Sequence, residues 1–300
     1  MMFKSGYVAV IGRPNVGKST LLNRIIGMRI LAVSDKAQTT RNKINLIYSD
    51  DESQIIFLDT PGMQTPRNEL GDYMLRESSS ALEDVDLITY IVDTSKIIGK
   101  QDRLILDKLK KLKDKKVILL INKIDSIPKE AVLHLIEMYS KEMDFLEIIP
   151  ISAREGDGTE IYLDTVKKYL PEGPKYYTDD YVTDRPMKFI VAEIIREKAL
   201  QFLEEEVPHG VAVEIEQMEE LEDRTNIIAT IFVERENHKG IIIGKGGSML
   251  KKIGSAARQD LIDLLMTKVD LRIWVKVDKN WRDNETRLKG HGYLWLGQRA

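Results

Sequence analysis

The residues with the clearest chemical potential form a glycine-rich loop near the start of the chain. Residues 12–20 read GRPNVGKST and lie between an apolar run at residues 7–11 and a helical pattern at residues 21–26. Glycines let consecutive backbone N–H groups and a helix N-terminus point at one anion, the arrangement that phosphates prefer. Lys18 would reach the β- and γ-phosphates, and the hydroxyl of Ser19 would bind Mg²⁺. The loop predicts a nucleoside triphosphate as substrate.

A second candidate loop follows the apolar segment at residues 55–58. Residues 59–62 read DTPG. Asp59 would hold Mg²⁺ through water, and the N–H of Gly62 would approach the γ-phosphate. Upstream, the polar residues 38–42 read QTTRN and are typical of a switch loop. There Thr40 is the candidate that completes Mg²⁺ coordination, Thr39 is a close rival, and an ordinary loop threonine is equally open.

Two further loops indicate which base is bound. Residues 122–125 read NKID, and Asp125 would accept from the ring N1–H and the exocyclic amine of guanine, a donor pair that adenine lacks. Asn122 would brace the loop, while the methylene stem of Lys123 would lie along the base. The small Ser152 and Ala153 would let a backbone N–H approach the guanine oxygen. The pattern therefore favours GTP and GDP over adenine nucleotides.

These loops need a scaffold that brings them to one edge. Apolar segments at residues 7–11, 55–58, 87–92, 117–121 and 147–151 alternate with helical patterns. This alternation predicts a doubly wound α/β fold with a mostly parallel sheet, whose ligand loops follow the carboxyl ends of the strands. An aperiodic stretch rich in proline, glycine and acidic residues comes next, so we expect domains at 1–173 and 187–300 joined by a linker at 174–186.

Composition narrows the function classes. The chain contains no cysteine, which excludes disulfides, thiolate catalysis and cysteine-based zinc sites. We expect a soluble cytoplasmic protein, because no secretory signal is recognised and the longest apolar run, residues 117–121, is far too short to span a membrane. The net charge of −3 hides an asymmetry: residues 193–236 hold 4 basic and 13 acidic residues, whereas residues 239–300 hold 13 basic and 6 acidic. The late basic segment favours a polyanionic partner.

A glycine loop lies inside that basic segment. Residues 244–247 read GKGG and follow a helical pattern at 189–203, strand patterns at 211–215 and 225–233, and the apolar residues 241–243. A further helix and a strand at 271–277 are expected after the loop. Gly-x-x-Gly at the start of a helix is the signature of KH domains, in which a nucleic-acid backbone lies against the glycines and unpaired bases enter an apolar groove. Taken alone, the loop is also compatible with a simple turn or another phosphate contact.

In this order, the motifs resemble those of the translation-factor class of P-loop GTPases. The residue types at positions 12–20, 38–41 and 59–62 narrow the resemblance to the Era-like GTPases. With residues 183–185 and 192–198, the resemblance covers essentially the whole chain. It implies a P-loop GTPase domain followed by a smaller α+β type II KH domain. It also implies hydrolysis of GTP to GDP and phosphate, binding to the 3′ region of 16S rRNA, and assistance in assembly and maturation of the 30S ribosomal subunit.

The resemblance carries details of mechanism and partners. Met63 stands where Ras-like enzymes have the glutamine that orients water. Several relatives instead use K⁺ as a charge clamp held partly by an asparagine of the phosphate loop, and Asn15 occupies that place. A monomer is expected, and weak peripheral association with the inner face of the cell membrane stays open. Trp281 matches a C-terminal family pattern and either stacks on a base or packs in the core, with packing favoured.

The predicted site residues follow from these motifs. Nucleotide contacts are expected from Asn15, Val16, Gly17, Lys18, Ser19, Thr20, Thr39, Asp59, Asn122, Lys123, Asp125, Ser152 and Ala153. Magnesium contacts are expected from Ser19, Thr40 and Asp59, and catalytic roles from Asn15, Lys18, Thr40 and Gly62. RNA contacts are expected from Ile243, Gly244, Lys245, Gly246, Gly247 and Lys251.

Two other function classes compete with this hypothesis. One is a GTPase switch that acts on a protein partner or a membrane surface and uses the KH-like half only as a scaffold. The intact glycine loop at residues 244–247 argues against it. The other is a P-loop ATPase, against which the NKID sequence of residues 122–125 speaks.

Overall fold

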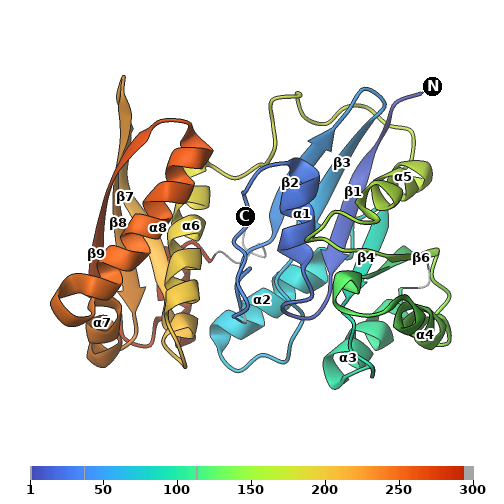
Figure 1. Ribbon diagram of the computed structural model, residues 1–300, viewed down its shortest axis with the longest axis horizontal. Helices are drawn as coiled ribbons and strands as arrows, with labels where there is room; N and C mark the ends of the chain where they lie inside the picture. Colours follow the sequence, from blue (N-terminus) through green and yellow to red (C-terminus); the bar gives the residue numbers. More distant parts are fainter. Residues whose placement is uncertain (1, 37, 113, 294–300) are drawn as a thin grey trace. The chain divides into compact units, whose positions relative to one another are not determined.

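The structure is a computed structural model that describes residues 2–36, 38–112 and 114–293 (Figure 1). Its internal contacts divide the chain into two compact units. The first unit comprises Met1–Met28, Thr40–Thr65 and Met74–Asp184, and the second comprises Arg29–Thr39, Pro66–Tyr73 and Arg185–Ala300. Two short segments from the first half of the sequence therefore belong, by their contacts, to the second unit.

The first unit is built on a six-stranded sheet. Its strands are β1 (Lys4–Ile11), β2 (Ile44–Ser49), β3 (Ser53–Asp59), β4 (Leu87–Val92), β5 (Lys116–Ile121) and β6 (Glu147–Pro150), in the order β2-β3-β1-β4-β5-β6. All neighbouring pairs are parallel except β2 with β3, which is antiparallel. The predicted α/β class with a mostly parallel sheet is confirmed. Strand β2 is an addition that the sequence pattern did not predict.

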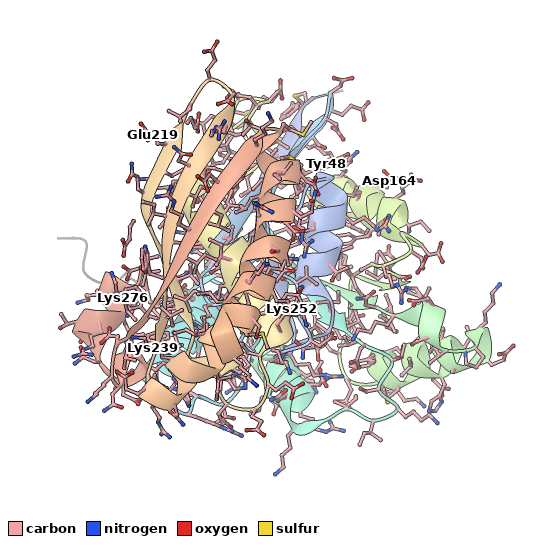
Figure 2. All side chains as sticks on the ribbon, turned by 60° about the vertical axis from the view of Figure 1, so that its left-hand side comes forward. Tyr48, Asp164, Glu219, Lys239, Lys252 and Lys276 are labelled. Atoms are coloured by element: carbon pink, nitrogen blue, oxygen red, sulfur yellow. The ribbon has the colours of Figure 1, made fainter. Side chains whose placement is uncertain are left out.

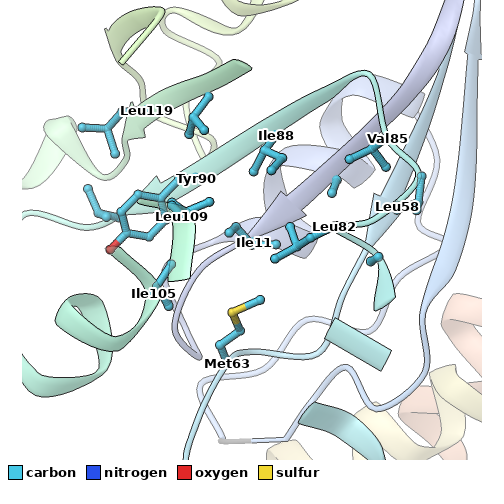
Figure 3. Packing of buried hydrophobic residues seen from close by; sticks show 14 of the residues in the cluster. Ile11, Leu58, Met63, Leu82, Val85, Ile88, Tyr90, Ile105, Leu109 and Leu119 are labelled. Carbon is cyan, nitrogen blue, oxygen red and sulfur yellow. The ribbon is translucent and has the colours of Figure 1, made fainter. Parts of the chain in front are cut away.

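Helices cover both faces of this sheet, as the buried strands of a parallel sheet require. They are α1 (Lys18–Ile26), α2 (Glu69–Ser80), α3 (Lys100–Leu109), α4 (Lys129–Ser140) and α5 (Thr159–Tyr169). A hydrophobic cluster joins one face of the sheet to α3 and α4, and it includes Ile11, Tyr90 and Leu119 from the strands and Leu109 from α3 (Figure 3). Because β1, β3, β5 and β6 run in the same direction, their carboxyl ends carry the following loops to one edge of the sheet.

Most of the segment predicted as a linker forms hydrogen bonds with the first unit. Ser5 Oγ donates to the carbonyl of Pro174 at 2.7 Å, and the side-chain oxygen of Gln54 accepts from the N–H groups of Tyr176 and Tyr177 at 2.8 and 2.9 Å. Farther along, Thr183 Oγ1 donates to a carbonyl of β2, that of Asn45, at 2.7 Å. Contacts rather than local periodicity order this segment.

In its described residues, the second unit contains, in order, the helix, two strands, glycine loop, helix and strand that the sequence predicts, together with two further helices that it does not. Its elements are α6 (Met187–Phe202), β7 (Ala212–Glu220), β8 (Arg224–Val233), α7 (Glu236–Ile243), a short turn of helix at Lys245–Gly247, α8 (Ser248–Leu265), β9 (Lys268–Val277) and α9 (Glu285–Gly290). Strand β8 lies centrally, antiparallel to β7 and parallel to β9. The arrangement confirms a smaller α+β domain of the type II KH kind. The apolar residues 241–243, expected only as a run before the loop, end helix α7.

Trp281 lies in the core of the second unit. Its side chain is fully buried, its indole Nε1 donates to the carbonyl of Gly210 at 3.0 Å, and its ring stacks on Tyr293 with centroids 5.7 Å apart. The favoured alternative, packing rather than base stacking, is therefore confirmed. None of the helices in the described part of the chain is long and apolar enough to cross a membrane.

Replacing Trp281 with alanine should destabilise the second unit by about 3–5 kcal/mol, because it removes a fully buried aromatic side chain and leaves a cavity. The matched control is Trp274→Ala, since Trp274 is 60% exposed and its removal should change stability by only about 0.5 kcal/mol. Urea unfolding followed by circular dichroism measures both. Equal midpoints for the two variants would contradict the core assignment.

Candidate nucleotide site and nucleic-acid groove

The phosphate loop runs from the end of β1 into α1. Asn15 and Gly17 have positive φ angles of 65° and 104°, so the backbone turns sharply before α1 begins at Lys18. A Cβ atom at Gly17 would lie 2.2 Å from the side-chain nitrogen of Asn122. Only glycine fits this position, both because of its left-handed backbone and because of the close neighbour. The N-terminus of α1 is left facing the loop, as anion binding requires.

Lys18 is held inside the loop. Its ammonium group donates to the carbonyls of Gly12 at 3.3 Å and Arg13 at 3.2 Å, and the residue is 6% exposed. Burial lowers the pKa of Lys18 to about 8, although the nearby carboxyl of Asp59 opposes that shift. A phosphate anion in the loop would offset the cost of burying this charge, so the environment suits an anionic ligand.

Three side-chain oxygens converge beside the loop. Thr40 Oγ1 lies 3.2 Å from Ser19 Oγ, and each hydroxyl donates to Asp59 Oδ2 at 3.3 Å. Asp59 is fully buried, and burial raises its pKa to about 6, with the charge of Lys18 acting in the opposite direction. Its second oxygen, Oδ1, is buried and has no hydrogen-bond partner among the residues that the structure describes. A buried carboxylate with an unsatisfied oxygen and two hydroxyls fits Mg²⁺, which prefers oxygen ligands.

The two rival threonines differ in their surroundings. Thr39 Oγ1 donates to the carbonyl of Lys36 at 2.7 Å, within its own loop, whereas Thr40 Oγ1 reaches Asp59. The structure thus brings Thr40, and not Thr39, to the other predicted magnesium ligands.

The DTPG turn is fastened against the phosphate loop. Thr60 Oγ1 donates to the carbonyl of Val10 at 2.9 Å, and the N–H of Met63 donates to that of Gly12 at 3.2 Å. A Cβ at Gly62 would lie 2.8 Å from the backbone nitrogen of Pro14, so the close approach of the two loops requires glycine here. The Met63 side chain is 6% exposed and belongs to the hydrophobic cluster with Ile11 (Figure 3). It offers no group that could orient water.

Asn122 joins the predicted base loops to the phosphate loop. Its side-chain amide donates to the carbonyl of Val16 at 2.7 Å, and its side-chain oxygen accepts from the N–H of Ala153 at 2.9 Å. Lys123 adds a third connection, because its ammonium group donates to the carbonyl of Asn15 at 2.8 Å. The bracing geometry predicted for Asn122 is therefore present.

Asp125 lies at the exposed side of this arrangement, where one carboxylate oxygen accepts from Ser152 Oγ at 2.7 Å. The N–H of Ser152 donates to the carbonyl of Asp157 at 2.9 Å, and that of Ala153 donates to Asn122. Both N–H groups are thus bonded within the protein, and both residues brace the loops. An N–H contact from this segment to the guanine oxygen stays a prediction.

The sequence motifs missed two arginines that position the site. Arg24 on α1 donates from Nε to the carbonyl of Ala153 at 2.8 Å, which connects the first helix to a loop 129 positions away. Arg13, inside the phosphate loop, pairs with Asp93 and lies 3.2 Å from the buried Asp102, which also accepts from Tyr90 at 2.9 Å. No local pattern marks such contacts, because their partners are distant in sequence.

The glycine loop of the second unit turns sharply into the helix that follows it. Gly244, Gly246 and Gly247 all have positive φ angles, and α8 begins directly after them at Ser248. A Cβ at Gly244 would lie 2.8 Å from the backbone nitrogen of Met249. Three of the four loop residues therefore carry no side chain that would keep a nucleic-acid backbone away, and the fourth, Lys245, carries a positive charge.

Beside this loop, α8 and β9 enclose a groove with a volume of about 440 Å³. Of the predicted RNA-contacting residues, Gly247 and Lys251 line it, whereas Lys245 is exposed on the loop and Ile243 is partly buried at the end of α7. The lining residues that were not predicted are Leu250, Gly254, Ser255, Arg258, Leu271 and Ile273. The helical spacing of Lys251, Ser255 and Arg258 was the available signal, since residues four and seven positions apart share one face of a helix.

Comparison with protein families finds two matches along the chain. Residues 7–123 match the family described as 50S ribosome-binding GTPase, and residues 206–282 match the KH domain. The first match contains the phosphate loop and the DTPG turn, and the second contains the glycine loop at residues 244–247. Among curated proteins, GTPase Era of Clostridioides difficile (strain 630) is 49% identical over 295 residues, which cover 97% of this chain and 99% of that protein. GTPase Era of Caldanaerobacter subterraneus subsp. tengcongensis is 52% identical over 295 residues, covering 98% and 99%.

Solved structures give the same result. A crystal structure of Era in complex with MgGDPNP and nucleotides 1506–1542 of 16S ribosomal RNA superposes with a TM-score of 0.94 at 41% identity, covering 98% of this chain and 100% of that chain. A crystal structure of a single-residue variant of Aquifex aeolicus Era bound to GDP·AlF4⁻ has a TM-score of 0.93 at 41% identity with the same coverage.

Proposed function

Because this chain belongs to the Era family of GTPases, we propose that it is a GTP-driven switch that binds the 3′ region of 16S rRNA and assists assembly of the 30S subunit. The observation that carries the proposal is that one chain holds a convergent Ser19–Thr40–Asp59 oxygen cluster and a glycine-loop groove. A relative with 41% identity over its whole length has been crystallised with both a GTP analogue and that RNA. The proposed place of action is the cytoplasm, where the subunit is assembled.

In the proposed reaction, the backbone of residues 12–20 and the ammonium group of Lys18 hold the phosphates, and Lys18 stabilises the charge that develops on the transferred phosphoryl group. Ser19 and Thr40 would bind Mg²⁺, and Asp59 would hold it through water; the ion would neutralise phosphate oxygens. The N–H of Gly62 would donate to the γ-phosphate. Asn122, Lys123 and Asp125 would select guanine, with Asp125 as the acceptor for its two donors.

The proposed switch follows from the placement of Thr40. A threonine that binds Mg²⁺ only while the γ-phosphate is present orders its loop in the GTP state and releases it after hydrolysis. Because Arg29–Thr39 belongs by its contacts to the second unit, the loop that ends at Thr40 is connected by chain to the RNA-binding half. The competing idea of a scaffold for a protein or membrane partner gains no support, since the groove and its glycine loop are intact.

The experiment that tests the coupled function is equilibrium binding to RNA 1506–1542 of 16S rRNA and to a scrambled RNA of equal length. Each is measured with a non-hydrolysable GTP analogue and with GDP. We expect sequence-dependent binding that is tighter with the analogue. Equal, weak binding to both RNAs in both states would reject the RNA function while leaving the GTPase intact.

We also predict that K⁺ stimulates hydrolysis. Met63 supplies no water-orienting group, so a monovalent cation held partly by Asn15 would serve as the charge clamp. Phosphate release should be about 10²-fold faster in KCl than in NaCl at equal ionic strength, the lower end of the effect of one preorganised electrostatic contact. Asn15→Ala should remove most of that difference. Identical rates of phosphate release in the two salts for the unaltered protein would contradict this prediction.

A further inference from the structure

Strand β9 presents two chemically different faces. Leu271 and Ile273 line the groove beside α8. The residues between and after them, Arg272, Trp274 and Lys276, point to the opposite side of the sheet, because successive side chains of a strand alternate. We call these three residues the β9 outer face. Trp274 is 60% exposed there, in contrast to the fully buried Trp281.

The exposed indole is flanked by positive charge. The side chains of Arg272 and Lys276 are 70% and 56% exposed. Trp274 pairs in register with Thr230 of the central strand, whose hydroxyl is bonded to Glu216 at 2.6 Å. The indole therefore has a polar, well-anchored neighbour beside it and solvent above it. A flat aromatic ring between two cations is the arrangement on which unpaired bases stack while phosphates meet the charges.

Acidic residues define where a phosphate backbone can run. Glu216 lies 2.8 Å from Lys276 and Asp270 lies 3.8 Å from Arg272, so part of the positive charge is balanced locally. Toward β7 the face becomes acidic, with Glu214 and, at the far end of the sheet from Lys276, Glu219 (Figure 2). A polyanion is thus repelled from β7 and accepted only along the β9 side.

The β9 outer face is continuous with the groove. Strand β9 is an edge strand, since only β8 pairs with it in the described sheet. The groove and Trp274 are therefore separated only by the thickness of this one strand. A single strand that leaves the groove past Leu271 and Ile273 reaches Arg272 and Trp274 by turning around the edge. Basic residues occur on the groove side as well, where Lys251 and Arg258 lie on α8.

We propose that Trp274, with Arg272 and Lys276, forms a second RNA contact that stacks an unpaired base of the strand emerging from the groove. This inference rests on the proposed RNA-binding function. Single-stranded RNA is the occupant that the surface favours, because the face combines an aromatic platform with cations and continues from the groove. A protein partner would not require that continuity.

Two RNA lengths separate this contact from groove binding. The short probe is a fluorescein-labelled RNA of about eight nucleotides from the 3′ end of 16S rRNA, enough to fill a KH groove that clamps about four. The long probe is RNA 1506–1542. With the full-length protein and a non-hydrolysable GTP analogue, Trp274→Ala should raise the Kd of the long RNA by about tenfold and leave that of the short RNA unchanged. Trp274→Phe should restore most of the affinity, because a phenyl ring still stacks.

A matched control is Leu221→Ala, which removes another exposed hydrophobic side chain, at the turn between β7 and β8, and should change neither Kd. Unchanged affinity of Trp274→Ala for the long RNA would overturn the inference while leaving the proposed function intact. An equal loss for both RNAs would also overturn it, because it would show damage to the groove through β9. If the unaltered protein binds neither RNA, the proposed function itself fails, and the inference fails with it.

Discussion

Asp125→Asn should lower the affinity for GTP by about 10²–10⁴ and create affinity for XTP, the triphosphate of xanthosine. The carboxylate can accept from both guanine donors, whereas an amide offers one acceptor and turns an N–H₂ group toward the remaining donor. The variant keeps one hydrogen bond, now to a neutral acceptor, and sets two donors against each other at the second position. At about 1.5–3 kcal/mol for each of the two charge-assisted hydrogen bonds that is replaced, this gives that range. Xanthine carries an oxygen in place of the amine, so the amide N–H₂ of the variant can donate to it.

Competition binding with unlabelled GTP, XTP and ATP measures this exchange of specificity. Ser152→Ala is the matched control, because it removes only the hydroxyl that donates to Asp125 at 2.7 Å and leaves the carboxylate in place. It should weaken GTP binding only a few-fold and keep guanine preferred. If Asp125→Asn still binds GTP more tightly than XTP, Asp125 is not the residue that reads the base.

Lys18→Met should reduce kcat/KM for GTP by about 10²–10³ without loss of fold stability. The loss of rate follows because one preorganised charge facing the phosphates is removed, a change that costs other enzymes a similar factor. Stability should be unchanged or higher, because burial already lowers the pKa of Lys18 to about 8 and the apolar replacement does not have to be desolvated as a charge. Single-turnover phosphate release and thermal unfolding without nucleotide measure the two effects.

Lys108→Met provides a comparison within the same unit. Burial lowers the pKa of Lys108 as well, but its ammonium group bonds to Ser79 on α2, away from the phosphate loop. Hydrolysis by this variant should match that of the unaltered protein. If Lys18→Met hydrolyses GTP normally, or if both variants lose activity to the same extent, the phosphate role of Lys18 is wrong.

Features that depend on neighbouring residues were predictable from the sequence. The phosphate loop between a strand and a helix, and the glycine loop directly before another helix, follow from local residue types, and the structure confirms both placements. The alternation of apolar and helical segments likewise predicted the parallel sheet and the end of the sheet at which the loops meet. Strand β2 and helix α7 were not predicted, because a short apolar run does not by itself distinguish a strand from a helix.

Choices between equivalent residues needed the tertiary structure. Adjacent threonines are alike in sequence, but only Thr40 reaches Asp59. Trp274 and Trp281 are both aromatic residues of one basic segment, yet one is exposed and the other stacks inside the core on Tyr293. The sequence likewise did not predict the contacts of Arg24 and Arg13 with residues of distant loops. Sequence alone determined the kinds of loop and their order, because backbone conformation there is dictated by adjacent residues. Which side chains meet was decided by packing between elements far apart in the chain, because burial and charge pairing depend on those long-range neighbours.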